Sequence, residues 1–327
     1  MQELLDLLAT VLPRVANIAL FIAFGVALAN LLVGFGAVRA IARLSRPLTR
    51  PANLPEEVGT AILTTTASTT AGYGMLAEFR ESGALDDRAT LVAVTINTFF
   101  GFAQHVFTFY APVLIPILGL EVGLLYVGTR AAVALAITAT GVLAGALLLD
   151  GDNVDRAATP AVEADGGRAA EGQSAGAVVR DAVESGLAKT RDILPRLLVI
   201  YTAVAFLTSR YDVARVAGAG AADPLAGTVG LPAAAVPVVA VFTLDTTNGA
   251  LVLSPLVEEG VFTPRTAVAT MLVGGIVSFT VSTFKRSIPF QYGIWGADFG
   301  SKVIVVNTAL KVAWIAVALV VLLYVPF

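Results

Sequence analysis

The sequence predicts an all-α polytopic membrane protein built from two inverted repeats, each with about three transmembrane helices plus a re-entrant helical hairpin. Composition is the first reason: the 327 residues are 57% hydrophobic and 14% charged. A soluble domain carries about 25% charged residues, so most of this surface is expected to face lipid. Long continuous apolar runs are the second reason, because they favour helices over the alternating pattern of a barrel. An internal repeat is the third.

The repeat becomes visible when the chain is shifted by 177 residues, the distance from Thr69 to Thr246. The stretch "TTAGYGMLAEFRESGALDDRATLVAV" then aligns with "TTNGALVLSPLVEEGVFTPRTAVATM". Between the copies lies a polar stretch rich in Gly, Ala and Asp, a composition typical of a flexible linker. We therefore expect a first repeat over residues 1–149, a flexible acidic linker over 150–189 and a second repeat over 190–327.

Each repeat offers three apolar runs for spanning helices. They cover roughly Val15–Val38, Ala89–Thr108, Val122–Leu149, Leu197–Ser209 with a helical lead-in, Thr266–Phe284 and Val303–Tyr324.

A polar knot interrupts each repeat between its first and second runs. In the first repeat it reads "TTTASTTAGYG", Thr64–Gly74, and in the second "FTLDTTNG", Phe242–Gly249. Each knot either belongs to a full span or forms the tip of a re-entrant hairpin. The hairpin topology places most arginine and lysine residues, including those of the linker, on the cytoplasmic side, as the positive-inside rule requires. A full span would divide them about evenly, so the hairpin, and with it an inverted second repeat, is favoured.

A broken helix exposes backbone amides and carbonyls, which membranes tolerate only where they line a cavity or are buried in protein. Inverted repeats with broken helices and a ligand at the midplane are typical of secondary transporters. The simpler interpretation is that Thr and Ser join packed helices. The presence of such a segment at equivalent positions of both repeats favours a binding site.

The segment "TTASTTAGYGMLAEFRESGALDDRATLVAVTINTFFGFAQHVFTFYAPVLIPILG" resembles the nucleoside-recognition, or Gate, domain of archaeal and bacterial membrane proteins. Three features carry the resemblance: the small, polar hairpin, the "ESG" or "EEG" turn, and a His or basic position before a Pro-x-x-x-Pro run that ends in glycine. Both repeats carry the resemblance, which covers most of the chain outside the linker. The family is similar to the membrane parts of concentrative nucleoside transporters and of the ferrous iron transport protein B.

This resemblance implies transport of a nucleoside-like solute through paired inverted hairpins of Gate type. It also suggests a homo-oligomer, without fixing the number of subunits. The chain departs from the iron transporter pattern, because it has no G-x-x-x-x-G-K-[ST] loop and no cysteine to bind ferrous iron.

Asp245 is the most distinctive candidate residue, because a carboxylate at bilayer depth is costly and indicates function by default. It suits a coupling H⁺ or Na⁺, or a solute; the alternative is an ion pair with Arg130 or Lys311. Lys285 and Arg286 have a simpler interpretation as anchors at the membrane interface. The expected substrate-binding residues share hydroxyl, amide, carboxylate, imidazole or cationic groups: Ser68, Thr69, Thr70, Asn97, Gln104, His105, Asp245, Thr246, Thr247, Asn248, Lys285 and Arg286.

Several functions are excluded at this stage. The sequence carries no catalytic motif, so we expect no enzyme and no cofactor. It has no cysteine and one histidine, so we expect no metal site. A net charge of −3 without a basic stripe argues against nucleic acid as a partner.

The sequence thus predicts a multi-pass protein of the cell (cytoplasmic) membrane, with a cytoplasmic linker, that carries a small polar solute by alternating access. The alternatives are a permease for a metal or inorganic ion, and, from another class, a non-transporting membrane scaffold or lipid-headgroup binder. A scaffold would show tightly packed hairpin tips without a cavity, whereas a lipid binder would open a groove sideways with Lys285 and Arg286 at its rim.

Overall fold

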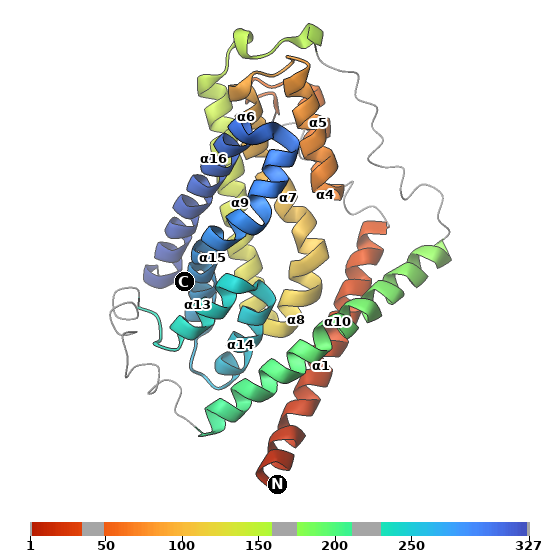
Figure 1. Ribbon diagram of the computed structural model, residues 1–327, viewed down its shortest axis with the longest axis vertical. Helices are drawn as coiled ribbons and strands as arrows, with labels where there is room; N and C mark the ends of the chain where they lie inside the picture. Colours follow the sequence, from red (N-terminus) through yellow and green to blue (C-terminus); the bar gives the residue numbers. More distant parts are fainter. Residues whose placement is uncertain (1, 35–48, 159–174, 211–229, 326–327) are drawn as a thin grey trace.

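The computed structural model describes residues 2–34, 49–158, 175–210 and 230–325, and every regular element in these ranges is helical (Figure 1). Within them, β-type pairing is limited to an isolated bridge between Leu85 and Val154. The prediction of an all-α protein is confirmed for these residues.

Four stretches of the described chain are long and apolar enough to cross a membrane: Val11–Leu28, Asp87–Leu118, Leu120–Leu148 and Ile288–Tyr324. At 1.5 Å per residue, Leu120–Leu148 reaches about 44 Å, which exceeds the hydrocarbon core of about 30 Å. These stretches are formed by α1 (Gln2–Gly34), α6 (Asp87–Ile96), α7 (Thr98–His105), the π-helical η1 (Val106–Leu114), α8 (Ile115–Leu118), α9 (Leu120–Leu148) and α16 (Ile288–Tyr324).

Two of the six expected spans are not among these four stretches. Leu197–Ser209 with its helical lead-in lies in α10 (Ala175–Arg210), whose 36 residues reach about 54 Å. Thr266–Phe284 begins in α15 (Pro264–Ser282), whose 19 residues reach about 28 Å, and ends in η5 (Thr283–Ser287). The helix α10 instead lies along α1, and the two cross as a pair beside the remaining helices (Figure 1).

Each polar knot forms the break between two short antiparallel helices. The first hairpin is α4 (Glu56–Ala67) and α5 (Thr69–Glu81); the second is α13 (Ala235–Leu244) and α14 (Thr246–Glu258). Ser68 and Asp245 occupy the breaks in an extended conformation, and each caps the following helix. The Ser68 hydroxyl accepts the Ala71 N–H at 3.3 Å, and the Asp245 carboxylate accepts the Asn248 N–H at 2.8 Å. Such caps satisfy one of the free amides at a helix start.

The backbone repeats at the offset found in the sequence. Gly83 and Gly260 both adopt positive φ, at +82° and +76°. Gly119 and Gly296 do the same, at +79° and +74°, a conformation that favours glycine. The π-helical segments η1 and η5 (Thr283–Ser287) also begin at equivalent positions, 106 and 283. The repeat is therefore visible in the chain path as well as in the residues.

Each hairpin packs against the other half of the chain. Tyr73 of α5 makes edge contacts with the rings of Phe290 and Trp295 in α16. In the opposite sense, Ser254 of α14 donates a 2.6 Å hydrogen bond to the Ile117 carbonyl in α8. The two hairpins lie toward opposite ends of the long axis of the molecule (Figure 1).

The expected linker carries regular structure at both ends. Residues 150–158 contain the short 3₁₀ helices η2 (Gly151–Asn153) and η3 (Arg156–Ala158), and the amide of Asp155 donates to the Ala84 carbonyl at 3.0 Å. Residues 175–189 belong to α10. Residues 159–174, between them, lie outside the described part of the chain.

Candidate functional site

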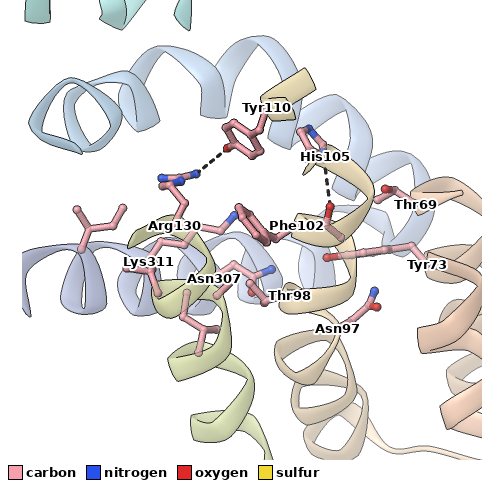
Figure 2. Close-up of a pocket in the computed structure, with 15 residues that line it drawn as sticks. Thr69, Tyr73, Asn97, Thr98, Phe102, His105, Tyr110, Arg130, Asn307 and Lys311 are labelled. Carbon is pink, nitrogen blue, oxygen red and sulfur yellow. Dashed lines mark hydrogen bonds between the residues drawn. The ribbon is translucent and has the colours of Figure 1, made fainter. Parts of the chain in front are cut away.

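A cavity of about 250 Å³ lies between the first hairpin and the helices that end each half of the chain. Its polar lining comes from α5, the α6–α7 junction, α7, η1, α9 and α16, and Figure 2 shows these side chains around a common space. The polar lining residues are Thr69, Tyr73, Asn97, Thr98, His105, Tyr110, Arg130, Asn307 and Lys311. Pockets for drug-sized ligands start at about 300 Å³, so this space suits a smaller molecule.

Asn97 is the break in the long helical run Asp87–Leu118. It separates α6 from α7, and the backbone groups freed beside it are bonded by a side chain of α9. The Thr138 hydroxyl donates to the Ile96 carbonyl at 2.9 Å and accepts the Phe99 N–H at 3.2 Å. The kink is therefore held by a cross-helix hydrogen bond, as in other interrupted membrane helices.

The side chain of Asn97 is buried, with 1% of its surface exposed, yet neither its amide oxygen nor its amide nitrogen has a hydrogen-bond partner. The amide oxygen of Asn307, across the cavity, is also buried and unpaired. An unmade hydrogen bond of a buried polar group costs about 1–3 kcal/mol. Because both residues line the cavity, polar groups of a bound molecule or water would satisfy them.

The other end of the cavity is basic. Arg130 projects from α9 and Lys311 from α16, and Figure 2 shows both on the side opposite Thr69 and Tyr73. The Arg130 guanidinium donates to the Tyr110 hydroxyl at 3.5 Å, a long bond to a neutral partner. No aspartate or glutamate lines the cavity, and none of the described carboxylates forms a salt bridge with either cation.

The two hairpins differ in the size of one side chain on the first arm. A Cβ added to Gly249 or Gly274 would approach Phe242 of α13 within 2.6 Å and 2.8 Å. The equivalent of Phe242 in the first hairpin is the smaller Thr65, whose hydroxyl bonds back to the Ala61 carbonyl of its own helix. The two repeats therefore share a backbone but differ in the side chains that pack within their hairpins.

Three of the twelve expected binding residues line this cavity. Thr69 enters from the start of α5, Asn97 from the α6–α7 break and His105 from the end of α7. The His105 side chain is exposed, and its Nδ1 lies 3.3 Å from the Gly101 carbonyl. The expectation that Asn97 faces a cavity is correct.

The other nine expected residues do not line it. Ser68 caps α5, Thr70 is exposed and Gln104 is half-buried outside the lining. Arg286 is exposed on η5, and the Lys285 side chain lies outside the described part of the structure. The remaining four, Asp245, Thr246, Thr247 and Asn248, gather at the second hairpin tip.

Asp245, the most distinctive candidate of the sequence, lies at the second hairpin tip and does not line this cavity. Its carboxylate accepts the Asn248 amide and pairs with neither Arg130 nor Lys311 among the described contacts. It caps α14, as a serine caps α5 at the equivalent break. Thr246, Thr247 and Asn248 follow it in α14 and do not line the cavity either.

The sequence analysis did not assign Tyr73, Thr98, Tyr110 or Asn307 to the site, and it considered Arg130 and Lys311 only as ion-pair partners of Asp245. A signal for Arg130 and Asn307 was present, because these two residues align at the repeat offset of 177 residues. Their position is polar inside both final spans, which indicates facing surfaces of the two halves. Lys311 aligns with Ala134 and carries no such signal.

Comparison with known protein families finds a match within the first half of the chain. Residues 15–121 match the family model described as Gate, nucleoside recognition, which confirms the resemblance over this part of the chain. The matched part includes the first hairpin, Asn97, His105 and Tyr110.

Two curated relatives come from Methanocaldococcus jannaschii. The uncharacterized protein MJ0880 is 24% identical over 310 residues, which cover 92% of this chain and 95% of that protein. The uncharacterized protein MJ0871 is 23% identical over 297 residues, which cover 90% of this chain and 88% of that protein. No solved structure matches the chain.

Proposed function

We propose that this protein is a secondary transporter of the cell membrane that moves a small polar solute by alternating access between two inverted halves. The solute site is the cavity beside the first hairpin, and each hairpin is a re-entrant element rather than a full span. Coupling to H⁺ or Na⁺ remains part of the proposal, with Asp245 as its candidate residue.

The buried, unpaired amide of Asn97 in this cavity is the observation that carries the proposal. A break in a spanning helix leaves backbone groups that need partners, and irregular backbone at membrane depth is tolerated where it lines a cavity. Here the break, the cavity and the unpaired side chain coincide. A bound polar solute would complete the missing hydrogen bonds, which is the arrangement found in transporters with discontinuous helices.

The arrangement of the hairpins supports the inverted topology. The arms of 10 to 13 residues reach about 15–20 Å, roughly half of a bilayer. The two hairpins lie toward opposite ends of the molecule, while the glycines and π-helical segments recur in the same chain order (Figure 1). Two copies with opposite orientation would produce this arrangement.

The alternatives fit less well. A scaffold is expected to pack its hairpin tips without a space, whereas Thr69 at the first tip borders a cavity of about 250 Å³. A permease for metal cations would need anionic or soft ligands, and the residues that line this cavity are neutral or basic.

Uptake into proteoliposomes tests the proposal. The purified protein is reconstituted, and uptake of labelled nucleosides, sugars, amino acids and organic acids is compared with that of empty liposomes. Asn97→Ala removes the unpaired amide, and Asn17→Ala removes an exposed amide on α1 as the matched control.

We expect saturable uptake of one solute class, reduced about two- to tenfold by Asn97→Ala and unchanged by Asn17→Ala, since a hydrogen bond between neutral groups contributes about 0.5–1.5 kcal/mol. Uptake that Asn97→Ala leaves intact would reject this cavity as the solute site. Uptake no greater than that of empty liposomes for every solute class would reject transport.

A further inference from the structure

We infer that the ligand of this cavity is a polar organic anion, whose carboxylate or phosphate group binds between Arg130 and Lys311. Its uncharged polar part then lies toward Asn97, Thr69 and Tyr73. This inference deepens the proposed function, because it names the chemical class of the solute, and it rests on the same cavity.

The charge balance of the cavity is the first step. The described lining contains two cationic side chains and no carboxylate. Arg130 and Lys311 carry like charges and line the same cavity, so each disfavours the charged form of the other. Among the described contacts Arg130 donates to the Tyr110 hydroxyl and to no carboxylate. An anion placed between the two cations would balance both charges.

The depth of Arg130 is the second step. It lies ten residues after the start of α9, about 15 Å along a helix that spans about 30 Å of hydrocarbon. Arginine stays protonated in proteins, so it cannot avoid the cost of burial by losing its proton. Charged residues at such depth pair or line a ligand path. Since no described carboxylate pairs with Arg130, the ligand is the remaining source of negative charge.

The polarity of the two ends is the third step. Figure 2 shows Arg130 and Lys311 at one end of the site, and Thr69, Tyr73 and Asn97 at the other. Amide and hydroxyl groups offer both donors and acceptors, which suit hydroxyls or a base edge. A planar guanidinium binds carboxylate or phosphate oxygens in pairs. The volume of about 250 Å³ holds a small metabolite with both kinds of group.

The repeat explains how the two cations come to share this site. Arg130 and Lys311 come from equivalent helices of the two halves, yet their own equivalents are Asn307 and Ala134. Each half therefore supplies one cation to a shared site between the halves. A solute held by both halves is in the position that alternating access requires, because the halves move relative to each other around it.

An anionic group of this kind has two sources, a soluble metabolite and a phospholipid headgroup. Thermal unfolding in a neutral detergent, without added lipid, tests the soluble source. The probes are sodium phosphate, sodium acetate, sodium citrate and ribose 5-phosphate, each compared with sodium chloride at equal ionic strength and with free ribose. Nanodiscs of phosphatidylglycerol and of phosphatidylcholine, compared in the same unfolding assay, test the lipid source.

The variants are Arg130→Gln and Lys311→Gln, with Arg191→Gln as the control. Arg191 is an exposed cation on α10 that does not line the cavity. We expect at least one organic anion to raise the melting temperature more than sodium chloride does, with an apparent Kd at least about tenfold weaker in either cavity variant and unchanged in Arg191→Gln. Arg130→Lys, which keeps the charge, is expected to recover part of the effect if a variant without the charge folds poorly.

Stabilisation by ribose equal to that by ribose 5-phosphate would overturn the inference. A loss of anion affinity in Arg191→Gln equal to that in the two cavity variants would also overturn it. Stabilisation by phosphatidylglycerol alone, abolished by Arg130→Gln, would keep the anion site and assign it to a headgroup. Absence of any effect from all four anions and from phosphatidylglycerol would also overturn it.

The outcome is separable from that of the proposed function. Binding in detergent does not require transport, so anion binding without uptake in liposomes would leave the site and reject the transporter. Uptake of uncharged solutes that Arg130→Gln does not reduce would leave the transporter and reject the anion.

Discussion

Gly72 controls how closely the two arms of the first hairpin pack. A Cβ added at this position would lie 2.7 Å from the Ala61 carbonyl oxygen and would overlap the Thr65 hydroxyl, both on the facing arm α4. Real Cβ atoms do not approach carbonyl oxygens this closely, so Gly72→Ala must push α5 away from α4. Overpacking of this kind costs about 1–3 kcal/mol.

The net change in stability on Gly72→Ala depends on the overlap with α4 and on the higher helix propensity of alanine. Alanine in a helix is more stable than glycine by about 0.5–1 kcal/mol, which offsets part of the overlap. The matched control is Gly74→Ala in the same helix, where an added Cβ meets no atom within 4 Å. We therefore expect Gly74→Ala to be neutral or slightly stabilising, and Gly72→Ala to destabilise by about 0.5–2 kcal/mol.

The assay is thermal unfolding of both variants in the same detergent, with solute uptake measured in parallel. Thr69 and Tyr73 reach the cavity from α5, so a shift of this helix moves them and should lower uptake in Gly72→Ala alone. Equal melting temperatures for the two variants would refute the packing argument. Equal uptake despite a lower melting temperature would refute the link between hairpin packing and the site.

Three further substitutions test single contacts, each by thermal unfolding. Thr138→Val should lower the free energy of unfolding by about 1–3 kcal/mol, because it leaves two backbone groups at the α6–α7 break without their hydrogen bonds. The control Thr129→Val loses a hydrogen bond only within its own helix and should lower the free energy of unfolding by less. Equal losses in the two variants would contradict this argument. Ser254→Ala should cost about 1–2 kcal/mol through the lost bond to Ile117, and a neutral result would show that this carbonyl finds another partner. Asp245→Ala should lose about 0.5–2 kcal/mol of capping energy, whereas Asp245→Asn, which can still cap, should retain most of the stability. A large loss of stability in both Asp245→Ala and Asp245→Asn would show that the carboxylate charge stabilises the fold by more than capping.

The repeat could be predicted from the sequence because its determinants are local. A polar break, a glycine turn and a proline occupy fixed positions along the chain, and each dictates a backbone conformation by itself. That is why Gly83 and Gly260 adopt the same φ in two stretches with few identical residues. The helix breaks at Ser68 and Asp245 likewise lie within the two polar knots that the sequence marks.

The site was only partly predictable because it depends on which helix faces share a space. Arg130 and Lys311 are far apart in sequence, and only packing of α9 against α16 brings them to one cavity. Asp245 shows a related difficulty: a carboxylate can bind a ligand or cap a helix, and residue type does not reveal which it does. The packing of Phe242 against Gly249 and Gly274 is likewise a matter of volume, which residue spacing does not report.

The contrast between Phe242 and Thr65 has a consequence for the energetics of exchange between two conformations. In the proposed transport cycle, two halves with identical side chains would give inward-facing and outward-facing forms that are related by a two-fold axis and equal in free energy. Phe242 in one half and Thr65 in the other break this equivalence. Differences of this kind between the halves would set the orientation in which the proposed transporter rests without solute.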